Sequence, residues 1–321
     1  MKQLMRALVT GIGGPAGKAV SKYLAKKGYL VVGVDMDPHA EAPVDTKCQV
    51  VPSSHPFYIE QLLSFIKQYE VSLLVPTVSE ELTLIARNRN LFEAAGAAVY
   101  VSSPIASWVC DDKFITAVYL ENYGIAVPKF ALSLLPAETQ GLVDFCGMPV
   151  IAKPRKSRGG RGVTVYRTAS QLEREKRKDL IFQEYIPGVE YDVNLFIDPQ
   201  PPHPVLANVV LEKNKMTNGA WGNAVTVTRV IEPNIEKLAL RAARCLALVG
   251  PLDLDIRRRL DGTPVVLEIN GRFGANVLSA KEVLEALTGC WIRDTRTGMA
   301  KGAPSTEEPI SFRPGRASFA T

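Results

Sequence analysis

An Asp-Gly dipeptide at 261–262 divides two runs of alternating apolar and polar residues, 251–256 and 265–272. Asp-Gly between such runs is typical of a two-residue hairpin turn, and that register places Asp255 directly opposite Glu268. Successive side chains of a strand point to opposite faces, so the hairpin is polar on one side and apolar on the other. The polar side carries Asp253, Asp255, Glu268 and Asn270, and the apolar side carries Leu254, Ile256, Leu267 and Ile269.

The carboxylates on the polar side of this hairpin would repel each other in the absence of a cation. Residues directly opposite on paired strands have Cβ atoms about 4.5–5.5 Å apart, where like charges repel. Asp255 and Glu268 face each other in this way, beside the amide oxygen of Asn270 and close to Arg272. Oxygen ligands suit Mg²⁺, which usually keeps waters and is shared with substrate phosphates. The hairpin therefore predicts a cation between the carboxylates; a solvent-facing acidic side of an amphipathic hairpin is the alternative.

The first hundred residues alternate between strand and helix patterns. We expect strands at 6–10, 30–34, 71–76 and 98–101 and helices at 15–27, 57–69 and 79–95. This alternation predicts a parallel, doubly wound sheet. The first turn, residues 10–17, is rich in glycine and opens a helix, and Asp35 ends the second strand, where a dinucleotide-binding fold reads a ribose. The pattern indicates either NAD binding or glycines that only permit a tight turn and close helix packing.

Two lysines and a glycine-rich loop stand in the middle of the chain. A helix is expected to begin near Lys113, and an apolar strand ends in Lys153. Residues 155–162 follow that strand with three glycines and several cationic side chains, and further strand patterns cover 180–186 and 190–196. The backbone N–H groups and charges of such a loop can fold over phosphates, whereas the structural alternative is an ordinary exposed loop.

Composition narrows the class of protein. With 321 residues the chain is long enough for two or three domains. Its net charge of +5 is small and scattered, which argues against nucleic-acid binding. The five cysteines form no disulfide or metal pattern, and no apolar run reaches the roughly 18 residues of a membrane-spanning helix. We expect a cytoplasmic protein without nucleic-acid or membrane partners.

Taken in this order, the motifs resemble the ATP-grasp superfamily, in particular single-unit proteins similar to the carbamoyl-phosphate-synthase large chain. The resemblance implies a combined α/β and α+β fold. Its parts are a Rossmann-like doubly wound parallel-sheet (pre-ATP-grasp) domain at 1–105, an ATP-grasp small lobe with a linker helix and the glycine-rich loop at 106–186, and a large lobe with the metal-binding hairpin at 187–321. Because the chain holds one such unit rather than two, carbamoyl-phosphate synthesis is not expected.

The resemblance also implies an ATP site. Lys113 and Lys153 would reach the phosphates, the glycine-rich loop would close over them, the 183–186 edge would read adenine with Glu184 beside its amino group, and Glu190 would take the ribose hydroxyls. The implied ATP-binding residues are Lys113, Lys153, Ser157, Gly159, Gly160, Gly162, Gln183, Glu184, Tyr185, Ile186 and Glu190.

The remaining implied residues hold metal and substrate. Asp255, Glu268 and Asn270 would bind Mg²⁺ or Mn²⁺, and Arg272, with Lys153, would act catalytically on the transferred phosphoryl group or the substrate carboxylate. Two departures are an aspartate at 255, where relatives carry glutamine or glutamate, and a glycine at 271, where proline is common. Arg229 and Glu81 are further candidates for substrate binding; Glu81 follows a parallel strand, and capping the next helix is its alternative role.

No Ser-His-Asp or Cys-His arrangement points to covalent or histidine catalysis. We therefore expect an ADP-forming carboxylate–amine ligase that makes an acyl phosphate from a small-molecule carboxylate and passes it to an amine, with a homodimer as the expected assembly. Segment 213–222 is either a substrate-facing loop or a plain surface loop. An ATP- and Mg²⁺-binding protein without ligase turnover and an NAD(P)-dependent dehydrogenase remain as alternatives.

Overall fold

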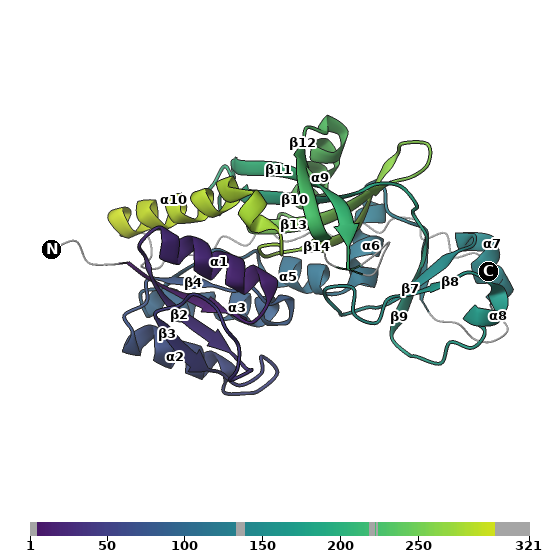
Figure 1. Cartoon of the computed structure of the whole chain (residues 1–321). Helices are drawn as coiled ribbons and strands as arrows, with labels where there is room; N and C mark the ends of the chain where they lie inside the picture. Colours follow the sequence, from purple (N-terminus) through teal and green to yellow (C-terminus); the bar gives the residue numbers. More distant parts are fainter. Residues whose placement is uncertain (1–4, 133–138, 218–221, 223, 299–321) are drawn as a thin grey trace.

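Three sheets make up the computed structural model, which describes residues 5–132, 139–217, 222 and 224–298. Within these residues the parallel-sheet domain contains β1–β5, the small lobe β6–β9 and the large lobe β10–β14 (Figure 1). This architecture confirms the predicted fold class. No helix in the described part of the chain has the length and apolar character to cross a membrane.

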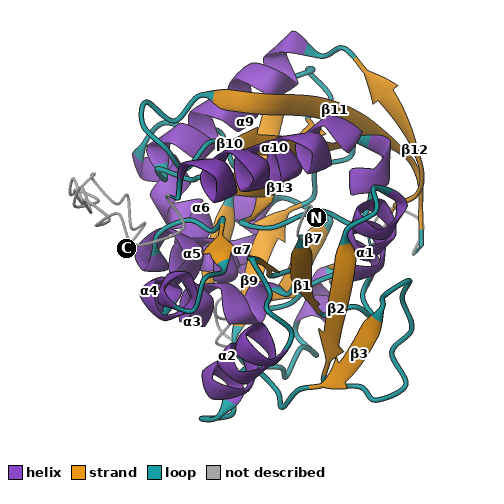
Figure 2. Cartoon of the chain, turned by 90° about the vertical axis from the view of Figure 1, so that its left-hand side faces the viewer, coloured by secondary structure: helices purple, strands orange, loops and turns teal. Residues whose placement is uncertain are grey.

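The parallel-sheet domain has strand order β3-β2-β1-β4-β5. Its elements are β1 (Arg6–Thr10), α1 (Pro15–Lys26), β2 (Leu30–Asp35), β3 (Thr46–Gln49), α2 (Tyr58–Gln68), β4 (Leu73–Val75), η1 (Ser79–Glu81), α3 (Leu82–Arg87), α4 (Arg89–Ala94) and β5 (Ala98–Val99). Helix α1 covers one face of the sheet and α2, α3 and α4 cover the other (Figure 2). Apolar side chains therefore alternate between two cores, as a doubly wound sheet requires.

One prediction in this domain was wrong, and one strand was missed. The expected helix at 79–95 is divided into η1, α3 and α4, because Asn88 leaves helical geometry and its side-chain amide donates to the carbonyl of Leu84. Strand β3 was not predicted, since Thr46–Gln49 has no apolar alternation. It forms at the sheet edge through parallel pairing with β2.

Helices α5 (Pro104–Asp111) and α6 (Lys113–Asn122) lead to the small lobe, whose strand order is β6-β9-β7-β8. Its elements are β6 (Phe130–Leu132), α7 (Thr139–Cys146), β7 (Val150–Pro154), β8 (Thr164–Tyr166), α8 (Ala169–Leu172) and β9 (Leu180–Glu184). Helix α6 and all but the first two residues of α5 fall within the predicted 106–186 unit, but apolar side chains of both helices share a core with β10, β13 and α9 of the large lobe.

The large lobe is an antiparallel sheet with strand order β12-β11-β10-β13-β14. It contains β10 (Glu190–Ile197), β11 (Val205–Met216), β12 (Ala224–Val230), α9 (Pro233–Cys245), β13 (Gly250–Arg258), β14 (Pro264–Asn270), η3 (Val277–Ser279) and α10 (Lys281–Thr297). Helices α9 and α10 pack against opposite faces of this sheet. Helix α10 also lies against α1, so one core joins the large lobe to the parallel-sheet domain (Figure 1).

The predicted hairpin forms, but its turn differs from the prediction. The N–H of Arg259 donates to the carbonyl of Thr263 at 2.8 Å, so the loop holds three residues rather than two. A bulge at Leu267 adds one residue to β14 and restores the predicted pairing of Asp255 with Glu268. The bulge also turns Leu267 into the wall of a cavity, away from the apolar face on which it was expected.

Candidate functional site

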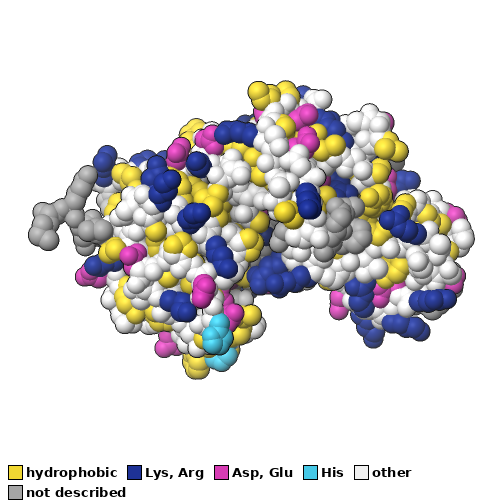
Figure 3. Space-filling view, viewed as in Figure 1, with side chains coloured by type: hydrophobic (Ala, Val, Ile, Leu, Met, Phe, Trp, Pro, Cys, Tyr) yellow, Lys and Arg dark blue, Asp and Glu magenta, His cyan; other side chains and the backbone are white. Residues whose placement is uncertain are grey.

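A cavity of about 550 Å³ lies between the three sheets. Its walls come from the loops after β1 and β4, from β7 and the loop that follows it, and from β9, β10, β13 and β14. In Figure 3 the molecule is hollowed between the parallel-sheet domain and the small lobe, and Lys and Arg side chains gather beside the hollow. Ligands of open parallel sheets bind at the carboxyl ends of the strands, which is the end that faces this cavity.

The polar face of the hairpin lines the cavity. Asp255 pairs with Glu268, and Asp253 pairs with Asn270. Each carboxylate of the first pair also faces a lysine: Lys213 Nζ lies 2.6 Å from Oδ1 of Asp255, and Lys113 Nζ lies 3.5 Å from Oε1 of Glu268. The repulsion expected between the two carboxylates is thus relieved by separate ion pairs.

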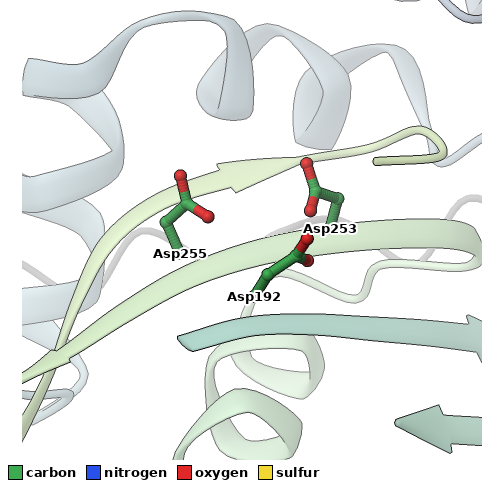
Figure 4. A group of neighbouring side chains, drawn as sticks. All are labelled: Asp192, Asp253 and Asp255. Carbon is green, nitrogen blue, oxygen red and sulfur yellow. The ribbon is translucent and has the colours of Figure 1, made fainter. Parts of the chain in front are cut away.

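A second group of carboxylates, which includes a residue that the sequence analysis did not single out, also meets at this face. Oxygen atoms of Asp192, Asp253 and Asp255 lie within 4.8 Å of one another (Figure 4). Burial and the charges of Asp192 and Asp255 raise the pKa of Asp253 well above its ordinary value. Sequence analysis missed Asp192, although it alternates with Glu190 along β10 and therefore shares its face.

Lys113 and Lys153 both line the cavity. Asp112 caps α6 by accepting a hydrogen bond from the N–H of Phe114 at 3.0 Å, which sets the first residue of the helix. The ammonium group of Lys113 then donates to the carbonyl of Ser157 at 2.6 Å. Lys153 lies on β7, and burial, aided by Lys113 but opposed by Glu268, lowers its pKa from 10.5 to about 8.

The glycine-rich loop reaches the cavity through Ser157, Gly159 and Gly160. Gly159, Gly160 and Gly162 have φ values of +61°, +71° and +73°, a region that disfavours other residues. Gly162 lies outside the cavity wall, and its carbonyl accepts from Nη1 of Arg177 at 2.6 Å. Both ends of the loop are therefore fixed by hydrogen bonds, at Ser157 and at Gly162.

The predicted adenine edge lies at the end of β9. Gln183, Glu184 and Ile186 line the cavity, whereas Tyr185 is not among the residues of its wall. The carboxylate of Glu184 pairs with Arg259 and accepts from the N–H of Lys129 at 3.1 Å. This arrangement leaves the chain near 183–186 at the cavity wall and holds the Glu184 side chain in a fixed position.

Glu190 and Arg272 occupy the inner part of the cavity. Glu190 is buried between Arg257 and Lys213, with Lys213 Nζ 2.7 Å from its Oε1. Arg272 donates to Oγ of Ser79 at 3.0 Å, to Oδ1 of Asn270 at 3.1 Å and to Oδ2 of Asp253 at 3.3 Å. Arg272 thus connects the hairpin to the loop after β4.

The other two candidates for substrate binding, Arg229 and Glu81, lie in different environments. Arg229 is exposed, pairs with Glu282 of α10 at 2.6 Å and does not line the cavity. Glu81 does line it, but its carboxylate is only 1% exposed and accepts from the N–H groups of Thr77 and Val78, both at 3.1 Å. Burial raises the pKa of Glu81 despite these bonds. These contacts match the capping alternative for Glu81.

The first glycine-rich turn lines the cavity and is held by contacts with neighbouring backbone and with Asp35. A Cβ atom at Gly17 would lie 2.2 Å from the carbonyl oxygen of Gly11, so α1 packs closely against the turn. Oδ2 of Asp35 accepts from the N–H of Gly13 at 2.8 Å. The turn therefore has the tight geometry and close helix packing that the structural alternative predicted.

Comparison with known proteins agrees with this arrangement. Residues 110–276 match the model of the ATP-grasp domain, and residues 8–100 match that of the PylC-like N-terminal domain. The chain therefore belongs to the ATP-grasp family. The PylC-like match includes the glycine-rich turn at residues 10–17. The two family matches therefore replace the interpretation of the chain as an NAD(P)-dependent dehydrogenase.

Curated relatives of this chain include ligases. The D-alanine–D-alanine ligase of Cupriavidus taiwanensis is 26% identical over 197 residues, which cover 57% of this chain and 60% of that protein. The phosphoribosylamine–glycine ligase of Ralstonia nicotianae is 24% identical over 296 residues, which cover 84% of this chain and 69% of that protein. The chain thus matches little more than half the length of the first relative.

Solved structures share the fold. The N5-carboxyaminoimidazole ribonucleotide synthetase from Thermotoga maritima has a TM-score of 0.64 and 21% identity, covering 95% of this chain and 78% of that chain. The L-amino acid ligase from Bacillus licheniformis has a TM-score of 0.64 and 17% identity, covering 88% and 71%. At these identities the similarity shows a shared fold.

Proposed function

We propose that this protein is an ADP-forming carboxylate–amine ligase that uses ATP. The observation that carries the proposal is that one cavity brings Lys113, Lys153 and Arg272 together with the carboxylates of β13 and β14. Phosphoryl transfer requires alignment and neutralisation of negative charge rather than a protein nucleophile, and these groups supply both. Family membership and the ligase activities of the curated relatives support the same reaction class.

In this proposal the small lobe binds the nucleotide. Lys113 and Lys153 contact the phosphates, and the loop from Ser157 through Gly159 and Gly160 to Gly162 covers them. The chain from Gln183 through Glu184 and Tyr185 to Ile186 reads adenine with its backbone groups, and Glu190 accepts the ribose hydroxyls. The positions of these residues around one cavity support the proposed roles. Tyr185 and Gly162 do not line the cavity, and in this proposal they contribute only as backbone of the segments that do.

The hairpin residues fit a magnesium ion. Asp255, Glu268 and Asn270 offer oxygen donors of the kind that Mg²⁺ or Mn²⁺ prefers, and all three line the cavity. Their present partners, Lys213 and Lys113, mark the position as one where positive charge is needed. A bound metal ion would neutralise phosphate oxygens during transfer.

The proposed reaction balances as two displacements. An oxygen of the substrate carboxylate forms a bond to the γ-phosphorus while the bond to the bridging β,γ-oxygen breaks, and ADP leaves. The amine nitrogen then attacks the acyl carbon, inorganic phosphate leaves and the nitrogen loses a proton. Arg272 orients the carboxylate or the phosphoryl group, because a guanidinium offers a planar pair of donors to either.

Trapping the activated acid tests the proposal. Pools of amino acids and small carboxylic acids, offered with ATP, Mg²⁺ and hydroxylamine, should give ADP and a hydroxamate, and dividing the active pool identifies the acid. Formation of AMP and pyrophosphate would refute the acyl-phosphate mechanism. ATP binding with no ADP release from any pool would support the alternative of a nucleotide-binding protein without turnover.

A further inference from the structure

One end of the cavity takes no part in the nucleotide and metal roles proposed above. Here the cavity is lined by Met36, which follows β2, and by Val51 and Pro52, which follow β3. The carbonyl of Met36 accepts a hydrogen bond from Nε2 of Gln49, the last residue of β3, at 3.2 Å. The two loops therefore lie side by side, and we call Met36, Val51 and Pro52 together the apolar end of the cavity.

The apolar end presents uncovered apolar surface to the cavity. The side chain of Met36 is 57% exposed, Pro52 is exposed and Val51 is partly exposed. Single apolar side chains on a surface are ordinary, whereas several that line one cavity mark a place where a ligand can cover them. A methionine is flexible and polarizable, so it adapts its shape to the apolar group that it contacts.

The polar groups beside the apolar end are already bonded within the domain. Oδ1 of Asp35 accepts from the N–H of Asp37 at 3.0 Å, and Oδ2 of Asp35 accepts from the N–H of Gly13 at 2.8 Å. The N–H of Val51 donates to Oε1 of Gln61 at 2.9 Å. A ligand group that lies here therefore gains chiefly from apolar contact.

Charge sets the direction in which an acid fits the cavity. Asp35 and Asp37 line it beside Met36, and their carboxylates would repel an anionic group at the apolar end. Arg272, in contrast, donates to Oγ of Ser79 at 3.0 Å, and Ser79 begins η1 directly after β4. A carboxylate oriented by Arg272 thus lies next to the parallel-sheet domain, with the rest of the acid free to extend along the ends of its strands.

We infer that the carboxylic acid substrate carries an apolar chain or ring, which binds at the apolar end. This assignment names the substrate class of the proposed ligase and rests on that proposal. In the sheet order β3-β2-β1-β4, only β1 separates β4 from β2. Two strand spacings of about 4.8 Å put roughly 10 Å between the ends of β4 and β2. A short acid does not span that distance, whereas a medium-length alkyl chain does.

Equilibrium dialysis of the full chain against radiolabelled butanoate and octanoate, without ATP, tests the inference. Octanoate should bind roughly tenfold or more tightly than butanoate, because its additional methylene groups leave water. Met36→Ser should weaken octanoate binding roughly fivefold and leave butanoate binding unchanged, whereas Met36→Leu should retain the affinity for octanoate. Ile231→Ser is the matched control, since Ile231 is an apolar side chain that is 88% exposed and does not line the cavity.

Equal affinities for the two acids, or octanoate binding that Met36→Ser does not change, would overturn the inference. Octylamine provides a further arm. If its binding depends on Met36 and that of octanoate does not, the apolar group belongs to the amine and the assignment to the acid is wrong. The hydroxylamine assay reports separately on the ligase proposal. Binding of octanoate that depends on Met36, with no ADP release from any acid pool, would count against ligase turnover alone.

Discussion

Glu81 shows how a buried carboxylate can serve the fold at the edge of an active site. It accepts hydrogen bonds from Thr10 and Tyr58 as well as from two backbone N–H groups, and so joins β1, α2 and the start of η1. Removing the carboxylate would take an acceptor from each of these donors, although the N–H of Thr77 also donates to Oγ1 of Thr10 at 3.0 Å. If Glu81 holds these elements together, its removal should lower the stability of the fold. If it binds substrate, its removal should lower substrate affinity.

Glu81→Ala should destabilise the protein by about 2–4 kcal/mol, because several buried donors are left unpaired. Glu81→Gln keeps an acceptor for the backbone N–H groups and should cost less. Urea unfolding measures both changes. If Glu81→Ala unfolds at the wild-type urea concentration and yet loses substrate affinity, the capping role is wrong.

Lys153 gives the site a pH dependence of known sign. Its folded pKa of about 8 lies below its unfolded value of 10.5, so between these values the unfolded chain binds a proton that the folded chain lacks. The penalty for charging Lys153 is therefore fully present below pH 8 and fades as the pH rises to 10.5.

Lys153→Met should consequently be more stable than the wild type at pH 7, and the difference should shrink toward pH 10 by at most about 1.4 kcal/mol per pH unit. Chemical denaturation of both proteins at several pH values measures it. ATP affinity of the wild type should fall above pH 8, as the cation is lost. A stability difference that does not change with pH would contradict the lowered pKa.

At the scale of elements, the glycine-rich loop depends on contacts at its two ends and on one ion pair near its middle. Arg158 pairs with Glu80 of the parallel-sheet domain at 2.7 Å, and both side chains are partly exposed. An exposed ion pair contributes little free energy, so the loop can open readily when the cavity is empty.

Trypsin should therefore cleave at Arg158 or Arg161 rapidly in the free protein and slowly with Mg²⁺ and a non-hydrolysable ATP analogue. Mass spectrometry of the fragments measures the two rates. Adenosine, which lacks phosphates, is the matched control and should give no protection. Equal rates with and without the analogue would argue against a phosphate-covering loop.

In the hairpin of β13 and β14, the length of the loop and a bulge in β14 together set which residues face each other. A three-residue loop alone would shift β14 by one position and turn Glu268 away from Asp255, because a shift of one residue reverses every side chain of a strand. The bulge at Leu267 cancels that shift. The polar face thus depends on two irregularities that compensate each other.

At the scale of the whole molecule, one hydrophobic core joins the parallel-sheet domain to the large lobe. It includes Val9 of β1, Phe196 of β10 and Leu211 of β11, with Trp291 of α10 fully buried among them. The indole N–H of Trp291 donates to the carbonyl of Ser72 at 3.1 Å. The cavity walls from the parallel-sheet domain and the large lobe are therefore held together by shared apolar packing, whereas the small lobe has its own core.

Trp291→Ala should cost about 3–5 kcal/mol and weaken both sheets together. Hydrogen exchange of the backbone amides in β1 and β11 should accelerate in parallel. Leu172→Ala, a buried substitution in the separate core of the small lobe, is the control and should leave both strands protected. Faster exchange in β11 with no change in β1 would show that the two parts unfold independently.

The sequence by itself determined the local elements and the residues of the hairpin face. Alternation along β13 and β14 selected Asp255, Glu268 and Asn270, and the first parallel sheet followed from repeated strand and helix patterns, because these features depend on neighbours close in the chain. It did not predict β3, which exists only through its pairing with β2, or the division of the 79–95 helix at Asn88.

Only the tertiary structure decided which charges meet across the cavity. Lys213, Asp192 and Asn276 come from β11, β10 and the segment before η3, and no local pattern relates them to Asp253 or Asp255. The ion pair of Arg229 with Glu282, away from the cavity, depends on where α10 packs on the large lobe. Side-chain alternation fixes the face on which a residue lies, but the packing of distant elements fixes what that face meets.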